Sequence, residues 1–195
     1  MSTPLEDLRN VDLSHLSKGE AKEFTVLLEE LEKREKREDS MASFYDFVKA
    51  IWPEFIAGAH HKKMAEAFDK IASGESKRLI INMPPRHTKS EFASYLFPAY
   101  LLGKRPKLKI IEATHTADLA INFGRRVRDL LESEEYAEIF PATELKADSR
   151  SAGKWSTSQG GQYYAAGIGG ALAGRGADLC IIDDPHSEQD AFSDK

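Results

Sequence analysis

The chain has 195 residues, a formal net charge of −5 and a single cysteine, Cys180. This length suits one domain with a full hydrophobic core and a small appendage. No apolar run approaches the length of a membrane span, and the N-terminus lacks a signal-peptide core, so we expect no membrane association. One cysteine excludes an internal disulfide and fits a reducing cytoplasm. The negative charge argues against a domain coated in nucleic acid, although a local basic patch can still contact DNA.

The N-terminal forty residues are predicted to form a helical arm ending in a charged linker, followed by a domain over residues 41–195. Ser17 and Glu20 have the spacing of a capping box. Four apolar residues then recur at helical spacing: Phe24, Leu27, Leu28 and Leu31. The mixed charge run EKREKREDS has little to bury, and it fits either a solvated helix end leading to a linker or a docking arm for a partner protein.

Two further helices are predicted before the first candidate motif. Ser40 is a candidate cap of one helix, which ends near Pro53, and the other begins near His60. Their apolar residues again follow helical spacing: Phe44, Phe47, Val48 and Ile51 in the first, and Met64, Phe68 and Ile71 in the second.

The stretch RLIINMPPRHTKS, residues 78–90, has the order of a phosphate-binding loop. A short apolar run at 79–81 is predicted to be a parallel strand, and it leads through a Pro-Pro turn to Lys89 and Ser90. In such a loop the backbone N–H groups face the phosphates, the lysine reaches the β- and γ-phosphate oxygens, and the serine hydroxyl binds Mg²⁺. The standard pattern has glycines where this chain has Met83 and Thr88, because such loops use positive φ angles.

After this loop the chain alternates between helix and strand, which predicts an α/β fold with a parallel sheet. We expect a helix over residues 90–102, kinked or ended by Pro98, and a strand over 108–113. A helix capped by Thr116 or Asp118 follows, with these apolar residues facing inward: Leu119, Phe123, Val127, Leu130 and Leu131.

Three arginines of that helix lie on or near its outer side: Arg125, Arg126 and Arg128. They fit either ion pairs along a solvated face or a contact with DNA or a neighbouring subunit. Residues 155–157 and 162–166 are predicted to pair as a hairpin around two consecutive glycines. The glycine-rich loop that follows contains Arg175 and precedes a strand, which is the wrong context for a dinucleotide-binding fingerprint.

The stretch DLCIIDD, residues 178–184, reads as an apolar strand that ends in two carboxylates. Asp183 is predicted to hold Mg²⁺, usually through water, and Asp184 to polarise the attacking water. Since adjacent residues of a strand point to opposite faces, we do not expect the two carboxylates to share a two-metal nuclease site. Cys180, in mid-strand, is predicted to be a small buried hydrophobe. Together with the first loop, this strand predicts a site for ATP and Mg²⁺.

From about His60 to Ser187 the chain resembles the ATPase region of tailed-phage terminase large subunits. The matching stretches are MPPRHTKSEFASYLFPAYLLG, INFGRRVRDLL, IFPATELKADSRSAGKWST and GGQYYAAGIGGALAGRGADLCIIDDPHS. Pro84, Pro85 and Arg86 are similar to the deviant Walker A motif of this family, in which PPR replaces the first glycine. Members often carry glycine at the position of Thr88, where the family varies.

The resemblance implies a RecA-like P-loop ATPase, and it implies a role for individual residues. The loop residues that bind the nucleotide are then Pro84, Pro85, Arg86, His87, Thr88, Lys89 and Ser90. His60 contributes to the adenine pocket, or else is a histidine at a helix N-terminus without a ligand. Ser90 and Asp183 hold Mg²⁺.

The resemblance also implies the catalytic residues. Asp184 is expected to be the catalytic acid, with Glu188 as the alternative. Arg86 is expected to contact the γ-phosphate or a sensing carboxylate. Arg175 is either an arginine finger on a neighbouring subunit's nucleotide or a structural residue of its loop.

The function implied is the ATPase part of a viral DNA-packaging motor, which couples ATP hydrolysis to translocation of double-stranded DNA into a procapsid. The expected partners are double-stranded DNA, the portal protein and the small terminase subunit, with a homo-oligomeric ring on the procapsid in the host cytoplasm. The alternatives are another P-loop ATPase, such as a helicase lobe, or a non-catalytic module that binds a nucleotide or a protein.

The family's sheet places the strand after Walker B between the P-loop strand and the Walker B strand. The sequence ends at Lys195, ahead of that strand and of the family's nuclease domain, so we read it as an N-terminal piece with an incomplete ATPase domain. We therefore expect marginal stability, pairing or aggregation through the open strand edges, and weak ATPase activity of this chain alone.

Overall fold

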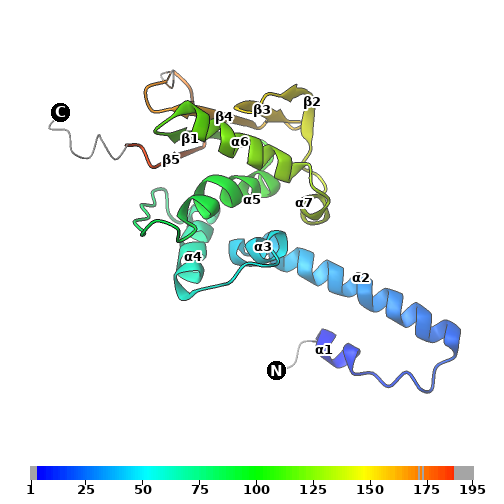
Figure 1. Ribbon diagram of the computed structural model, residues 1–195. Helices are drawn as coiled ribbons and strands as arrows, with labels where there is room; N and C mark the ends of the chain where they lie inside the picture. Colours follow the sequence, from blue (N-terminus) through cyan, green and yellow to red (C-terminus); the bar gives the residue numbers. More distant parts are fainter. Residues whose placement is uncertain (1–3, 171, 173, 187–195) are drawn as a thin grey trace.

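The computed structural model describes residues 4–170, 172 and 174–186, and shows a mixed five-stranded sheet flanked by helices (Figure 1). In chain order the elements are α1 (Pro4–Arg9), α2 (Lys18–Ala42), α3 (Phe44–Ile51), α4 (Ala59–Ser73), the π-helix η1 (Glu91–Leu96), α5 (Phe97–Lys104), β1 (Lys109–Thr114), α6 (Ala117–Leu131), α7 (Glu134–Ile139), β2 (Leu145–Arg150), β3 (Lys154–Thr157), β4 (Gln162–Gly167) and β5 (Leu179–Asp183). The predicted α/β class is confirmed. No helix within the described ranges is long and apolar enough to cross a membrane.

The sheet has the strand order β2-β3-β4-β1-β5. β1 lies between β4 and β5 and is parallel to both, so Glu112 at its centre is level with Ala165 on one side and Ile181 on the other. β3 and β4 form the predicted antiparallel hairpin, and β2 extends it with a further antiparallel strand that the sequence analysis missed. The sheet is therefore mixed rather than parallel throughout.

The helices begin at the polar residues that cap them. Ser17 and Glu20 form the predicted capping box, and Thr116 accepts a hydrogen bond from the Leu119 amide at the start of α6. Ser43, not Ser40, caps α3, because Ser40 lies inside α2 and its hydroxyl donates to the Lys36 carbonyl at 2.7 Å. The charged run at residues 32–40 is therefore part of α2 and is not a linker.

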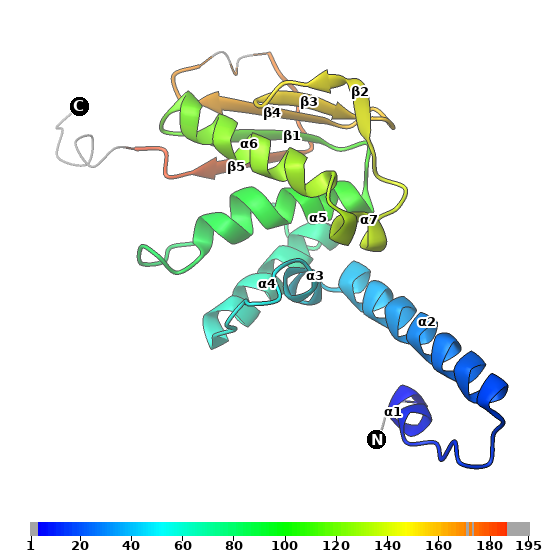
Figure 2. The same cartoon turned by 45° about the vertical axis from the view of Figure 1, so that its right-hand side comes forward.

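Figure 2 shows α2 extending away from the rest of the molecule, with α1 beside it. Its apolar stripe is only partly covered, and Leu27 and Leu31 are exposed. α1 contacts α2, and Arg9 Nε lies 2.6 Å from Glu32 Oε1. α2 leads directly into α3, whose Phe44 is fully buried.

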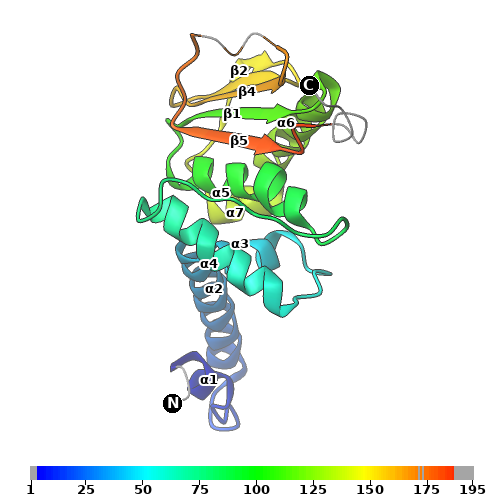
Figure 3. The ribbon, with the colours of Figure 1, turned by 90° about the vertical axis from the view of Figure 1, so that its left-hand side faces the viewer.

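An aromatic cluster centred on Phe44 joins α3, α4, η1 and α5. The Phe44 ring lies 5.2 to 5.5 Å, centroid to centroid, from four other rings, those of Phe68, Phe92, Phe97 and Tyr100. Three of these contacts are edge-to-face and the fourth, with Tyr100, is tilted; the edge-to-face arrangement adds to the free energy gained from burial. In all three ribbon views α5 lies between the sheet and the pair α3–α4 (Figures 1 to 3).

The helix after the candidate loop changes type at the position where a proline was expected to disturb it. Residues 91–96 form a π-helix, and the Phe97 amide donates to the Phe92 carbonyl, five residues back. Pro98 follows in the first turn of α5, where its missing N–H group costs little. On α6, four predicted core residues are buried, whereas Leu119, which was expected to face inward, is 39% exposed.

The predicted strand at residues 79–81 does not join the sheet. This run is extended without ladder hydrogen bonds, and Ile80 is 86% exposed. Within the described part of the chain β5 pairs with β1 alone, so β5 forms one edge of the sheet (Figure 3). A groove of about 430 Å³ separates β5 from the extended run and is lined mainly by aliphatic side chains. Cys180, predicted to be buried, is exposed at this edge.

We expect this edge to cause self-association, because unpaired strand groups and exposed aliphatic side chains promote pairing between chains. Ile182, 61% exposed on β5, is the position at which to test this. Ile182→Lys should weaken self-association roughly tenfold, equivalent to ~1.4 kcal/mol, measured by sedimentation velocity over a range of protein concentrations. Val26→Lys, at an exposed position of α2, is the matched control. Equal association of both variants and the wild type would contradict the prediction.

Candidate phosphate-binding site

The two predicted motifs meet in one cavity of about 410 Å³. Its lining consists of one continuous loop and one residue from the end of β5: Met83, Pro84, Pro85, Arg86, His87, Thr88, Lys89, Ser90, Glu91 and Asp184. The loop lies at the N-terminal end of η1, and Asp184 follows the last residue of β5. The structure therefore brings together two segments that are 95 residues apart in the sequence.

Lys89 joins the two motifs. Its Nζ lies 3.3 Å from Asp183 Oδ1 and also contacts Asp184 Oδ1. Partial burial lowers the pKa of Lys89, but the hydrogen bond to Asp184 and the charges of Asp183 and Asp184 outweigh this effect and raise the pKa. Lys89 is thus held in its charged form at the wall of the cavity, which is the form that binds a phosphate.

The two carboxylates do not point to opposite sides, contrary to the sequence-based expectation. Asp183 is the last residue of β5 and is buried, whereas Asp184 lies beyond the strand with φ 43° and an exposed side chain. This left-handed backbone conformation turns Asp184 out of the strand alternation, so both side chains reach Lys89. The Asp184 carbonyl accepts a hydrogen bond from the His115 amide at 3.2 Å, which fixes this turn against the end of β1.

Backbone strain is concentrated at this cavity. Among the described residues, the non-glycine residues with positive φ are Arg86 (62°), Thr88 (60°) and Asp184 (43°), and all three line it. A non-glycine residue in this conformation costs about 1–2 kcal/mol, and such residues collect at sites where the surroundings impose the conformation. The standard pattern has glycine at residues 83 and 88; the structure shows positive φ at Thr88 and not at Met83.

Two buried polar residues behind Asp183 were missed by the sequence analysis. Ser94, on η1, donates a hydrogen bond to Asp183 Oδ2 at 3.2 Å and is fully buried. Glu112, on β1, is also fully buried, and neither carboxyl oxygen has a hydrogen-bond partner within the described residues. Burial raises the pKa of Glu112 well above its usual value, the nearby Ser94 hydroxyl acts in the opposite direction, and the charge of Asp183 raises it further. The sequence signal that could have identified Glu112 is a charged residue inside an otherwise apolar run that is predicted to be a strand.

Of the three arginines of α6, Arg126 contacts a residue that lines the cavity. Arg126 binds Glu91, the residue after Ser90, through two hydrogen bonds of 2.9 and 2.5 Å, and its guanidinium stacks on Tyr95 at 4.2 Å. Arg128 pairs with the adjacent Asp129. These contacts favour the ion-pair interpretation for both residues. Arg125 is exposed.

Three predicted site residues do not line the cavity, namely His60, Arg175 and Asp183, although Asp183 contacts Lys89. His60 packs its ring against His61 and His87 and is not part of the lining, whereas the buried His61 contacts the loop at Thr88. The guanidinium of Arg175 stacks on the Tyr164 ring of β4 at 3.8 Å, a contact within the chain. Glu188 lies outside the described residues.

Oxygen ligands for Mg²⁺ lie in and beside the cavity: Ser90 lines it, and Asp183 Oδ1 lies 3.3 Å from Lys89 Nζ. The predicted ligands, the Ser90 hydroxyl and the Asp183 carboxylate, have the chemistry that Mg²⁺ prefers, and Mg²⁺ in phosphate sites usually takes only one or two protein ligands. The donor set therefore fits a magnesium ion held chiefly by phosphate oxygens and water.

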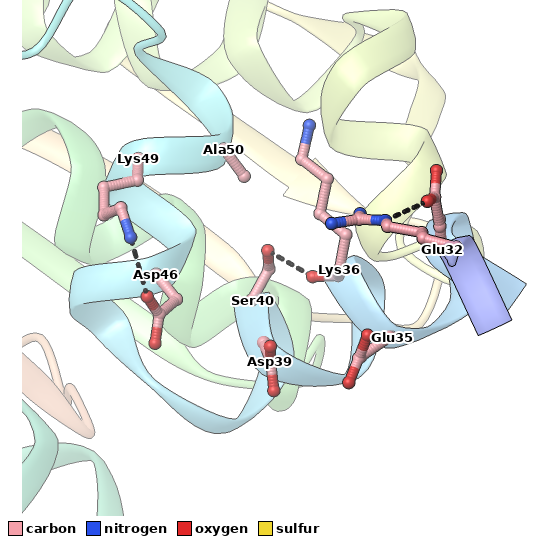
Figure 4. A pocket seen from close by; sticks show the side chains of 9 residues that line it. Glu32, Glu35, Lys36, Asp39, Ser40, Asp46, Lys49 and Ala50 are labelled. Atoms are coloured by element: carbon pink, nitrogen blue, oxygen red, sulfur yellow. Dashed lines mark hydrogen bonds and ion pairs between the residues drawn. The ribbon is translucent and has the colours of Figure 1, made fainter. Parts of the chain in front are cut away.

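A second cavity, of about 350 Å³, lies between α1, α2 and α3 (Figure 4). Its wall is charged, and the charges bind one another: Arg9 pairs with Glu32, and Lys49 Nζ lies 3.4 Å from Asp46 Oδ1. It contains none of the predicted site residues. The cavity at Lys89 is therefore the candidate phosphate site.

Comparison of the chain with known protein families, curated proteins and solved structures finds no match. The site is therefore defined by its own geometry: a strained loop, a lysine held between two carboxylates, and the end of a strand.

Replacing Glu112 tests the electrostatics behind the site. Because the folded pKa lies above the usual value of 4.5, the folded chain binds this proton more tightly than the unfolded chain, and wild-type stability falls as pH rises through that window. Glu112→Gln removes the ionisable group, so the free energy of unfolding of this variant relative to wild type should increase as the pH rises above 4.5, the usual pKa of a glutamate. Urea unfolding at a series of pH values measures it.

Glu132→Gln removes the carboxyl group of an exposed glutamate and is the control for this series. A stability difference between Glu112→Gln and wild type that does not change with pH would contradict the expected direction.

Proposed function

We propose that this chain is the ATPase part of a viral DNA-packaging motor of the terminase large-subunit type. The observation that carries the proposal is Lys89, which contacts both acidic residues at the end of β5 from a strained loop at a helix N-terminus. That arrangement matches what phosphoryl transfer from ATP demands: amides and a cation for the phosphates, and carboxylates beside them for metal and water. The resemblance of the sequence to terminases supplies the motor and its DNA substrate.

In this proposal each wall of the cavity has a separate role. The loop amides and Lys89 bind the phosphates, and the contacts of Lys89 with Asp183 and Asp184 are exchanged in part for phosphate oxygens. Ser90 and Asp183 hold Mg²⁺, which when bound neutralises phosphate charge. Asp184, exposed at the mouth, orients and polarises the attacking water, while Arg86 reaches the γ-phosphate.

A RecA-like P-loop arrangement of the sheet is part of the same proposal. In such a fold a further parallel strand would occupy the groove between β5 and residues 77–81. A strand there would pair with the open side of β5, and the extended run could pair on its other side. Exposed aliphatic side chains on both walls, Ile80 and Ile182, support the idea.

The partners belong to the same proposal and rest on the resemblance alone. They are double-stranded DNA, the portal protein and the small terminase subunit, with a ring of subunits docked on the procapsid in the host cytoplasm. Arg175 can act as an arginine finger on the nucleotide of a neighbouring subunit only if its guanidinium leaves the Tyr164 ring, on which it stacks in this chain.

Lys89→Ala tests the phosphate site directly. Loss of a charge-assisted hydrogen bond costs about 1.5–3 kcal/mol, so MgATP should bind roughly ten- to a hundredfold more weakly. Isothermal titration of the chain with MgATP measures this. Lys107→Ala, at an exposed lysine of the loop before β1, should retain wild-type affinity. Equal affinities of Lys89→Ala and wild type would remove the basis of the proposal.

Asp184→Asn separates hydrolysis from binding. The variant keeps the shape of the side chain and loses the carboxylate that polarises water, so we expect MgATP binding to persist and MgATP turnover to fall by at least about a hundredfold. Glu188→Gln is the comparison, because it removes the alternative acid. If Glu188→Gln stops turnover and Asp184→Asn does not, the catalytic acid is Glu188. Binding by the wild type with no turnover under any condition would favour the non-catalytic alternative.

A further inference from the structure

A chain of three hydrogen bonds connects the start of α4 to the candidate loop. The Gly58 amide donates to His61 Nδ1 at 2.8 Å, His61 Nε2 lies 2.7 Å from Thr88 Oγ1, and Thr88 Oγ1 donates to the His87 carbonyl at 2.6 Å. Since Nδ1 accepts a hydrogen bond, the proton of the neutral ring is on Nε2, and this nitrogen donates to Thr88. Every donor then has one acceptor, so the three bonds form together without conflict.

Thr88 adopts an unfavourable backbone conformation at a decisive position. Its φ of 60° is one that β-branched residues rarely take, and at this point a phosphate-binding loop ordinarily has glycine. The Thr88 carbonyl accepts the Phe92 amide at 3.0 Å, so this residue also anchors the first helical turn, which leads into η1. The conformation of Thr88 therefore sets the direction in which Lys89 and Ser90 leave the loop.

His61 is well placed to impose that conformation, because it is fixed on its other sides. The side chain is 6% exposed, and its ring packs against Phe55 at 4.7 Å and Phe92 at 5.5 Å between centroids. Burial lowers the pKa of His61, and the neighbouring His60 and His87 lower it further, which favours the neutral ring that the hydrogen bonds require. Phe92 belongs to η1, so the same histidine contacts both the loop and the helix that follows it.

We propose that His61 is a positioning residue for phosphate binding: through the Thr88 hydroxyl it holds the loop in the conformation that glycine would otherwise permit. The proposal rests on the proposed function for its ligand, the phosphates of a nucleotide. It assigns to His61, rather than to His60, the histidine contribution to the site, and it explains how the chain tolerates threonine at residue 88.

A double-mutant cycle in the full 195-residue chain tests the proposal, with MgATP as the probe. His61→Phe retains the ring packing and loses the donor to Thr88, so the Kd for MgATP should rise about three- to tenfold, the range expected for a neutral hydrogen bond. In the Thr88→Gly background the same His61→Phe change should alter Kd by less than about twofold, because glycine adopts positive φ without support. His61→Gln, which keeps an N–H donor near the Nε2 position, should restore part of the affinity.

A second readout requires no nucleotide. Arg86 is exposed in the loop, so trypsin cleavage after Arg86 reports loop opening in the chain alone. His61→Phe should accelerate this cleavage. If this variant does not fold, Thr88→Val takes its place in the experiment, because it removes the same hydrogen bond and leaves the packing of His61 untouched; it should also accelerate the cleavage. Cleavage after Lys107, in another exposed loop, is the internal control.

The outcomes separate this inference from the proposed function. If His61→Phe is cleaved faster after Arg86 but the wild type does not bind MgATP, the positioning role of His61 is supported and the proposal that the loop binds a nucleotide is contradicted. Unchanged Kd and unchanged cleavage in His61→Phe would overturn the positioning role. Equal effects of His61→Phe in the Thr88 and Thr88→Gly backgrounds would also overturn it, because the histidine would then act on the fold in general and not through Thr88.

Discussion

The contact of Lys89 with Asp183 and Asp184 is the interaction on which the site depends. It connects a loop outside the sheet to the end of an edge strand, across 95 residues of sequence. Without it, the loop would be attached to the sheet only through η1, because the preceding run at 79–81 makes no ladder bonds. The electrostatic contact between the motifs thus holds the loop against the end of β5, with which residues 79–81 make no strand pairing.

Polar groups from four elements surround this contact. Ser94 donates to Asp183, Glu112 is buried nearby, the half-buried Arg126 binds Glu91, and the buried His61 contacts Thr88. Each of these residues comes from a different element, β1, η1, α6 or α4. The site is therefore assembled by the packing of the whole helical layer on the sheet, and strain at three of its residues is balanced by contacts from several directions.

The features predicted from sequence were those with local causes. Ser17 and Glu20 cap α2, Thr116 caps α6, and the two acidic residues stand at the end of a strand, because each depends on neighbours within a few residues. The predictions that failed concern features that depend on tertiary contacts. Whether the apolar run at 79–81 pairs as a strand depends on a neighbouring strand, and whether His60 or His61 faces the loop depends on the exact rotation of α4. The left-handed turn at Asp184 likewise comes from contact with β1, which no local pattern records.

The one-residue connection between α2 and α3, Ser43, has a mechanical consequence. α2 has 25 residues, which at 1.5 Å per residue gives a rod roughly 37 Å long. Its inner end is fixed by Ser43, by Phe44 in the aromatic cluster, and by Arg37, whose Nε donates to the Ile139 carbonyl at 3.2 Å. A tilt of about 10° at Ser43 would carry the far end through roughly 6 Å. Small adjustments of packing around Phe44, which also contacts η1 through Phe92, are therefore magnified into displacements the size of a helix turn at the tip of this lever.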